Sequence, residues 1–118
     1  IIPGTIMKEG KYMAVFGVMR GYMQPQGHDQ IVSNLIAFYM NPQIALDVLS
    51  CQRMKGKSCM VEKACDENVM EDHKSKGHDV QVEEDRSHFG REQIIIKLDS
   101  GAYAVGTESR TDSNPAVY

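Results

Sequence analysis

A stretch rich in glycine, residues 17–28 (GVMRGYMQPQGH), stands between an apolar segment and a segment with helical periodicity. A turn of this kind between a strand and a helix can aim backbone N–H groups at an anion. When the anion is the carbonyl oxygen of an amide under attack, one such donor is typically worth about 3 kcal/mol to the transition state. The competing interpretation is an ordinary strand-to-helix connection in which Gly17, Gly21 and Gly27 relieve crowding.

The chain also holds imidazoles and thiols, the side chains that most often bind metals or act as nucleophiles. They are His28, His73, His78 and His88, and Cys51, Cys59 and Cys65. No pair of them has the spacing of a zinc ligand set, so no metal and no other cofactor is expected. An odd number of cysteines without a CxxC pair argues against a disulfide scaffold and slightly favours a cytoplasmic compartment.

These residues are carried by segments with clear secondary-structure signals. Gly10 is expected to turn a β-hairpin with arms at residues 5–7 and 12–18, and the second arm is apolar on both faces, so it needs cover on both. Apolar spacing predicts a helix from about His28 to Met40, whose mid-helix Asn34 must find hydrogen-bond partners if it is buried. Asn41 is expected to cap a second helix.

The second half of the chain reads as strands around one helix. Asp66 is expected to cap a third helix that ends at Gly77. Strands are expected at residues 59–62 and 79–82, and a hairpin at residues 93–98 and 102–105 turns through Asp99, Ser100 and Gly101. Residues 107–118 read as a polar closing tail.

Length and charge restrict the class of protein further. The 118 residues fit a single domain, residues 1–118, and 13 basic against 16 acidic residues give a formal net charge of −3. Because the basic residues are dispersed, nucleic acid and anionic membrane surfaces are not expected partners. The longest apolar runs are too short to cross a bilayer.

Several motifs, in order along the chain, resemble the gamma-glutamyltransferase (gamma-glutamyltranspeptidase) family, in particular its acylase-like branch, whose loop reads GVM-GG-MQPQGH. The matching stretches are residues 3 and 8–11 (P and KEGK), residues 17–28, residues 40–47 (MNPQIALD) with Arg53, residues 61–62 (VE), residues 76–80 (KGHDV), residues 89–93 (FGREQ) and residues 108–118 (ESRTDSNPAVY). The resemblance therefore runs over the whole chain, which is similar to the C-terminal part of the family's small subunit.

The resemblance implies an α+β fold that is part of an αββα four-layer sandwich of the N-terminal-nucleophile hydrolase type. It implies gamma-glutamyl amides such as glutathione as substrates, hydrolysed or transferred to an amino acid, and glutaryl amides in the acylase-like branch. It places the backbone N–H groups of Arg20 and Gly21 in the oxyanion hole. It also implies partners, a large subunit and the N-terminal part of the small subunit, hence a homo- or hetero-oligomer, and it allows a periplasmic or extracellular location.

Some residues depart from the family pattern. Ile1 is not the Thr nucleophile, so the 118 residues are not expected to act alone. Arg20 replaces the first glycine of the Gly-Gly pair, where a positive φ would strain it by about 1 kcal/mol or more and bring a cation to the pocket. Further departures are Gln52 before Arg53, Arg91 and Glu92 after Gly90, and Ser109.

These departures leave two interpretations open: a divergent enzyme, and a non-catalytic binding or assembly domain on the same scaffold. The side chain of Arg20 likewise has two interpretations: it binds a substrate carboxylate, or it is a solvated arginine at the tip of a loop.

Overall fold

A computed structural model describes residues 1–116 of the chain, which form two compact units. The first unit comprises residues 1–48 together with the segment from Gly90 onward, and the second comprises Leu49–Phe89. The single domain expected for residues 1–118 stays a prediction, and each unit is described here by itself.

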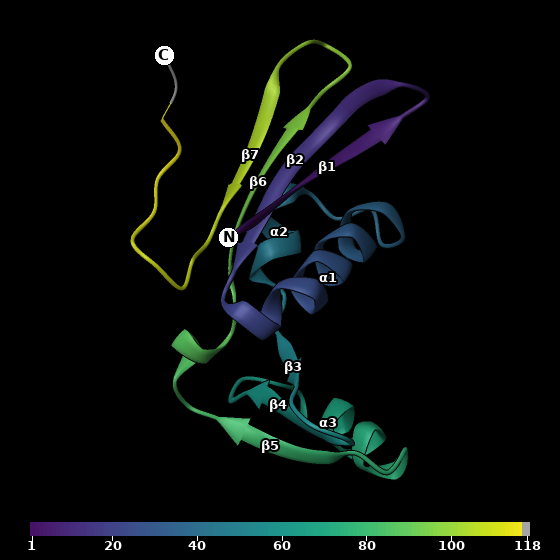
Figure 1. The fold of residues 1–118 in the computed structure, drawn as a ribbon, viewed down its shortest axis with the longest axis vertical. Helices are drawn as coiled ribbons and strands as arrows, with labels where there is room; N and C mark the ends of the chain where they lie inside the picture. Colours follow the sequence, from purple (N-terminus) through teal and green to yellow (C-terminus); the bar gives the residue numbers. More distant parts are fainter. Residues whose placement is uncertain (117–118) are drawn as a thin grey trace. The chain divides into compact units, whose positions relative to one another are not determined.

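The first unit is built on a four-stranded antiparallel sheet in the order β1-β2-β6-β7 (Figure 1). Its strands are β1 (Ile2–Lys8), β2 (Lys11–Met19), β6 (Arg91–Lys97) and β7 (Tyr103–Thr107). The two expected hairpins are confirmed, with Gly10 (φ 75°) and Gly101 (φ 86°) at their turns. The strands are longer than the apolar runs, because ladder pairing extends into the polar residues beside each turn.

Helices α1 (Gln24–Ile36) and α2 (Pro42–Asp47) cover one face of this sheet (Figure 1). The core contains Phe16, Val18 and Ile94 from the sheet and, from the helices, Ile31, Leu35, Ala45 and Leu46. The expected second helix is confirmed, since the Asn41 side chain accepts a hydrogen bond from the Ile44 N–H at 2.9 Å.

The expected bounds of the first helix, His28 to Met40, are wrong at both ends. The helix begins four residues earlier because Pro25, whose fixed φ suits a first turn, lies at its start. It ends at Ile36, and Tyr39 beyond it has a φ of 54° and a largely exposed side chain. The prediction placed the end of the helix too late because it counted Phe38 and Tyr39 as core residues, and both side chains are exposed.

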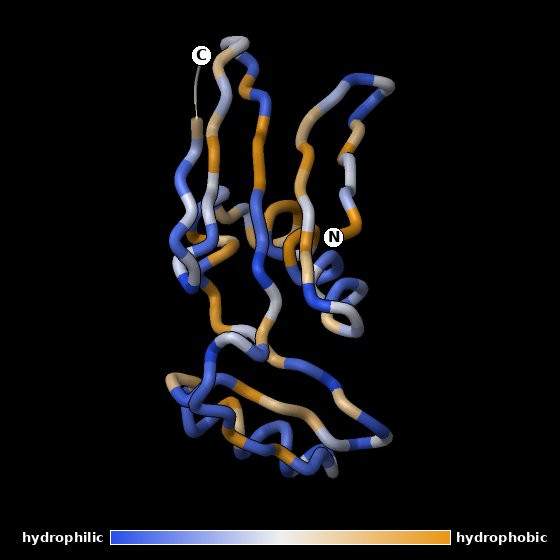
Figure 2. The backbone as a smooth tube through the Cα atoms, turned by 60° about the vertical axis from the view of Figure 1, so that its left-hand side comes forward, coloured by the Kyte–Doolittle hydropathy of each residue, from blue (hydrophilic) through white to orange (hydrophobic). Residues whose placement is uncertain are grey.

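The opposite face of the sheet is apolar and uncovered by any helix of this unit. Strand register aligns Thr5, Val15, Ile95 and Val105 in one row across all four strands. Val15 and Ile95 are 36% and 39% exposed, while Phe16 and Ile94, one position along on the helical side, are 8% and 0% exposed. Figure 2 shows the hydrophobic stretches along β2 and β6. The sequence expectation that β2 needs cover on both faces is met on one face only.

The second unit joins a three-stranded sheet to one helix. Its elements are β3 (Cys51–Arg53), β4 (Ser58–Glu62), α3 (Glu67–Ser75) and β5 (Asp79–Glu83), with sheet order β3-β4-β5. The expected caps are confirmed: Asp66 accepts from the Asn68 N–H at 2.7 Å, and Gly77 has a φ of 83°. Because β4 and β5 run parallel, α3 is the crossover between them, and the sequence analysis missed both this arrangement and β3.

Candidate oxyanion turn

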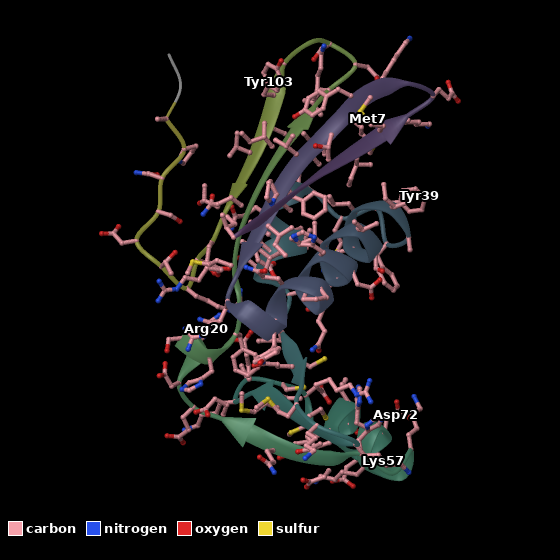
Figure 3. All side chains as sticks on the ribbon, viewed as in Figure 1. Met7, Arg20, Tyr39, Lys57, Asp72 and Tyr103 are labelled. Atoms are coloured by element: carbon pink, nitrogen blue, oxygen red, sulfur yellow. The ribbon has the colours of Figure 1, made fainter. Side chains whose placement is uncertain are left out.

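The candidate site is the turn between β2 and the short helix η1 (Gly21–Met23), where Figure 3 labels Arg20. Arg20 has φ 113° and ψ 60°, and Gly21 has a φ of 46°, so two consecutive residues lie at positive φ. The Met23 N–H donates to the Arg20 carbonyl at 2.9 Å and closes the turn. The structure thus gives Arg20 the backbone conformation that a glycine would adopt without strain.

The turn leaves backbone donors available. No turn, loop or side-chain hydrogen bond of residues 1–116 uses the N–H of Arg20 or of Gly21. A Cβ added to Gly21 would meet no atom within 4 Å, so the space beside it is open. Adjacent N–H groups of this kind are what an anion at the end of a strand requires.

Buried residues hold the turn on both sides. Val18 before it and Met23 after it are both 0% exposed. Gly90 packs closely against them, because a Cβ there would lie 3.1 Å from Val18 Cγ1 and 3.2 Å from Met23 Cγ. The backbone of the turn is therefore fixed by packing, which is the condition for donors that need no reorganisation.

Two contacts fix the helix that follows. His28 Nε2 lies 2.8 Å from the Ile2 carbonyl oxygen, and its ring meets the Phe16 ring edge-on at 5.0 Å. Gly27 leaves room for the buried Glu92, whose Oε1 would lie 2.8 Å from a Cβ at that position. Both residues act structurally, and His28 lies inside α1 rather than at its cap or border.

The guanidinium of Arg20 has no hydrogen-bond or ion-pair partner within residues 1–116. The residue is half-buried, and the neighbouring Tyr22 is 92% exposed. Two other arginines differ in this respect. Arg86 Nε lies 2.9 Å from the buried Glu62, and Arg110 Nη1 lies 2.9 Å from the buried Glu108.

The other histidines and the three cysteines singled out by sequence lie in the second unit. His73 and His78 lie together in the second unit, with ring centroids 5.6 Å apart, and His78 Nδ1 lies 3.2 Å from the Lys57 carbonyl oxygen. The three cysteines are free thiols, and burial raises the pKa of Cys51 and of Cys65. In the part of the chain that the structure describes, no three His, Cys, Asp or Glu side chains could hold a metal ion together.

Neither of the two hollows described here is lined by Arg20 or Gly21. One, of about 590 Å³, lies between the hairpin tips of the first unit and is lined by Lys8, Lys11, Lys97 and their neighbours. The other, of about 270 Å³, lies in the second unit beside Glu62 and Arg86. Within the turn, Gly21 is exposed and Arg20 is half-buried.

Sequence reasoning singled out one of the buried polar residues and missed others. Asn34, singled out as a mid-helix amide, is 5% exposed and donates to the Ala45 carbonyl oxygen at 3.0 Å. The residues after β7, expected to form a polar tail, instead bury Glu108 and the side chain of Arg110. A Glu and an Arg two positions apart were the available signal, but nothing in the spacing shows that such a pair is buried.

Comparisons with known proteins give the class. A cephalosporin acylase from Bacillus halodurans is 43% identical, with a TM-score of 0.96 over 100% of this chain and 22% of that one. A gamma-glutamyltranspeptidase from Pseudomonas nitroreducens complexed with L-DON is 15% identical, with a TM-score of 0.85 over 99% of this chain and 61% of that one. The transpeptidase CapD of Bacillus anthracis is 17% identical, with a TM-score of 0.81 over 99% and 70%. No curated protein sequence matches significantly.

The fold is therefore the mixed α and β fold of the N-terminal-nucleophile hydrolase type, as the resemblance implied. Residues 1–118 match the gamma-glutamyltranspeptidase family, and the chain belongs to it. This is a family of enzymes, and the chain spans 22% and 61% of the length of the first two structures named above. No helix among residues 1–116 is long and apolar enough to cross a membrane.

Proposed function

We propose that this chain is the C-terminal part of an amidohydrolase that cleaves gamma-glutamyl amides such as glutathione and passes the acyl group to water or to an amino acid. Family membership over residues 1–118 supports the reaction class. The observation that carries the role of this chain is the turn at Arg20 and Gly21, with two positive φ values and two N–H groups that no turn, loop or side-chain hydrogen bond of residues 1–116 uses.

The chemistry follows from that geometry. Attack on an amide carbonyl puts negative charge on its oxygen, and fixed N–H donors stabilise it without moving. We assign the nucleophile to the hydroxyl of an N-terminal Thr in the rest of the enzyme, as the family resemblance implies. The chain contributes core strands and the oxyanion donors, and by itself it has no activity.

The outer face of the sheet supports the need for further chain. In the row Thr5, Val15, Ile95 and Val105, the side chains of Val15 and Ile95 are 36% and 39% exposed, and a sandwich would cover them with a second sheet. We assign that sheet to the N-terminal part of the small subunit and to the large subunit. The assembled enzyme is then an oligomer of at least these pieces.

The test is cleavage of gamma-glutamyl-p-nitroanilide by the longest natural polypeptide that contains this chain. Release of p-nitroaniline that is lost when the N-terminal Thr is replaced by Ala supports the proposal. A folded, fully processed protein without turnover overturns it.

The second candidate is a binding or assembly domain on the same scaffold. Its supporting observation is Arg20, whose φ of 113° puts a strained cationic residue where a glycine would suffice. Replacing Arg20 by Gly in the same polypeptide separates the two. Activity that appears only in the variant identifies a scaffold that lost turnover, and activity already present in the wild type identifies an enzyme.

A further inference from the structure

We infer that His73 and His78 form a two-histidine site for a divalent transition-metal ion of the kind that imidazole binds, such as Ni²⁺, Cu²⁺ or Zn²⁺. The site lies in the second unit, where the ion would tie the C-terminal end of α3 to the start of β5. It does not depend on the proposed function, which rests on the turn after β2. The two imidazoles supply two ligands, and water completes the coordination.

The first observation is the helix end that brings the two side chains together. α3 ends in a Schellman motif, in which the His78 N–H donates to the His73 carbonyl oxygen at 3.1 Å and the Gly77 N–H donates to the Lys74 carbonyl oxygen at 2.8 Å. Gly77, with a φ of 83°, makes the left-handed step that the motif requires. Apolar side chains commonly meet at the two positions that His73 and His78 occupy. In this chain the side chains that meet there are both metal-binding.

The second observation is the geometry of the two rings. Their centroids lie 5.6 Å apart, and the ring planes are tilted by 55° rather than stacked. Two imidazoles on one tetrahedral ion, with metal–nitrogen distances of about 2.0–2.1 Å, have centroids about 5 Å apart. The separation of the rings is therefore close to the one that a shared ion requires. Both residues are half-buried, so an ion can reach them from solvent.

The third observation is the hydrogen bond that fixes the His78 ring. Nδ1 of His78 lies 3.2 Å from the Lys57 carbonyl oxygen. Because a carbonyl oxygen only accepts, Nδ1 carries the proton, and Nε2 of the neutral ring keeps its lone pair. A histidine that binds a metal usually donates its other ring N–H to a carbonyl or carboxylate oxygen, which orients the ring and makes the ligating nitrogen more basic. His78 already has this arrangement.

Two charged neighbours modify the affinity of the site for a cation. The Asp72 carboxylate, next to His73 in sequence, is paired with Lys76 at 2.6 Å. The Lys57 ammonium lies beside Gly77, since a Cβ added there would be 3.1 Å from Nζ. Figure 3 labels Lys57 and Asp72 in this part of the second unit. Because like charges repel, the Lys57 ammonium should weaken the binding of a metal ion.

The experiment is a calorimetric titration with Ni²⁺, at neutral pH, of the longest natural polypeptide that contains this chain. His73→Gln and His78→Gln each remove one ligand, and Lys57→Met removes the neighbouring cation while it keeps the backbone carbonyl. The matched control is His88→Gln, a histidine of the same unit whose Nε2 lies 3.6 Å from Asp85 Oδ2. Near-ultraviolet absorbance is recorded as well, because thiolate ligands give a charge-transfer band with Ni²⁺ that imidazoles do not.

We expect the wild type to bind one equivalent of Ni²⁺ whose affinity falls about tenfold or more in His73→Gln and in His78→Gln, because a two-ligand chelate becomes a single ligand. His88→Gln should leave that affinity unchanged. Lys57→Met should raise it by about twofold to tenfold. A gain of affinity cannot arise from unfolding, so this variant separates the site from any loss of structure in the histidine variants.

Three results overturn the two-histidine site. They are equal Ni²⁺ affinity in the wild type and both histidine variants, a loss in only one of the two variants, and a thiolate band that rises with the same equivalent of Ni²⁺. Each is read from metal binding alone, so an inactive polypeptide that binds Ni²⁺ through both histidines still supports the site.

Discussion

The guanidinium of Arg110 lies 2.9 Å from the carboxylate of Glu108, and the two side chains are 2% and 0% exposed. Arg110 Nη1 and Nη2 also donate to the carbonyl oxygens of Leu46 and Val48, both at 3.2 Å. Glu108 in turn accepts from the Glu92 N–H at 3.2 Å. One buried ion pair thus ties the segment after β7 to the end of α2 and to the start of β6.

Replacing Arg110 by Met should lower the free energy of unfolding by about 3–5 kcal/mol, because it leaves the carboxylate of Glu108 buried without its cation. The measurement is urea denaturation followed by circular dichroism. The matched control is Lys63→Met, which breaks an ion pair whose side chains are 69% and 78% exposed and should change stability by at most about 1 kcal/mol. Equal effects of the two replacements would show that the buried pair does not hold the fold.

Gly106 marks a second contact between β7 and α2. An added Cβ would lie 2.7 Å from the carbonyl carbon and oxygen of Pro42, which are backbone atoms that cannot rotate away. Gln43 pins the same strand, donating to the Thr107 carbonyl oxygen at 2.9 Å and accepting from the Thr107 N–H at 3.0 Å. Gly106→Ala should therefore cost about 1–3 kcal/mol of stability, measured by thermal and chemical denaturation.

Gly17→Ala is the control for this overpacking. Its added Cβ would come nearest to the Ile1 side chain, at 3.1 Å, and that flexible group can move. The expected loss of stability is smaller than for Gly106→Ala. The reverse order would contradict the close approach of α2 and β7.

The sequence predicted the elements with local signals well. Asn41 and Asp66 are helix caps, and Gly10 and Gly101 are turn residues, because each local conformation is fixed by the residue that forms it. Family motifs over the whole length also predicted the class of fold. Local signals determine where a strand or helix forms, but not which strand pairs with which. The pairing of β2 with β6 and the parallel pairing of β4 with β5 were therefore not predicted.

The candidate site was predicted in part. The sequence predicted that Arg20 would be strained if its φ were positive, and its φ is 113°. The role of Arg20 and Gly21 as oxyanion donors stays a prediction. The buried Glu92, Glu108 and Arg110 were missed because burial of a charged side chain depends on partners distant in sequence, which composition and periodicity do not encode.

Asp72 provides a pH-dependent prediction in α3. A hydrogen bond from Lys76, at 2.6 Å and four residues along the helix, lowers the pKa of the Asp72 carboxyl below its ordinary value. Because the folded-state pKa is the lower one, the stabilisation is present above the ordinary carboxyl pKa and is lost as the pH falls through the folded value. Carbon-detected NMR titration of Asp72 should show the low midpoint.

Lys76→Ala should move the Asp72 midpoint upward toward the ordinary carboxyl value. Lys74→Ala, on the same helix but paired with Glu71 at 2.8 Å, should leave it unchanged. A midpoint that responds equally to both lysines would mean that general surface charge, and not the Lys76 contact, sets the pKa.

The uncovered face of the sheet predicts association of the isolated 118 residues. Val15 and Ile95 are adjacent across β2 and β6 and remain 36% and 39% exposed. Apolar sheet surface of this kind is buried by association. Sedimentation velocity should show concentration-dependent self-association, reduced by Val15→Lys and unaffected by Val82→Lys in the second unit. A compact monomer that binds little hydrophobic dye at all concentrations would contradict this expectation.

Arg20→Gly tests the strain of the turn without any assumption about activity. The wild-type φ of 113° lies far from the left-handed minimum near 57°, so the replacement should relieve more strain than the added freedom of the unfolded glycine costs. The expected net gain is about 1 kcal/mol in the free energy of unfolding. Tyr39→Gly is the control, because its φ of 54° lies close to that minimum and its side chain is 88% exposed, so its stability should change little. Loss of stability in Arg20→Gly would mean that the arginine side chain holds the turn, and the strain that supports its role at the site would not exist.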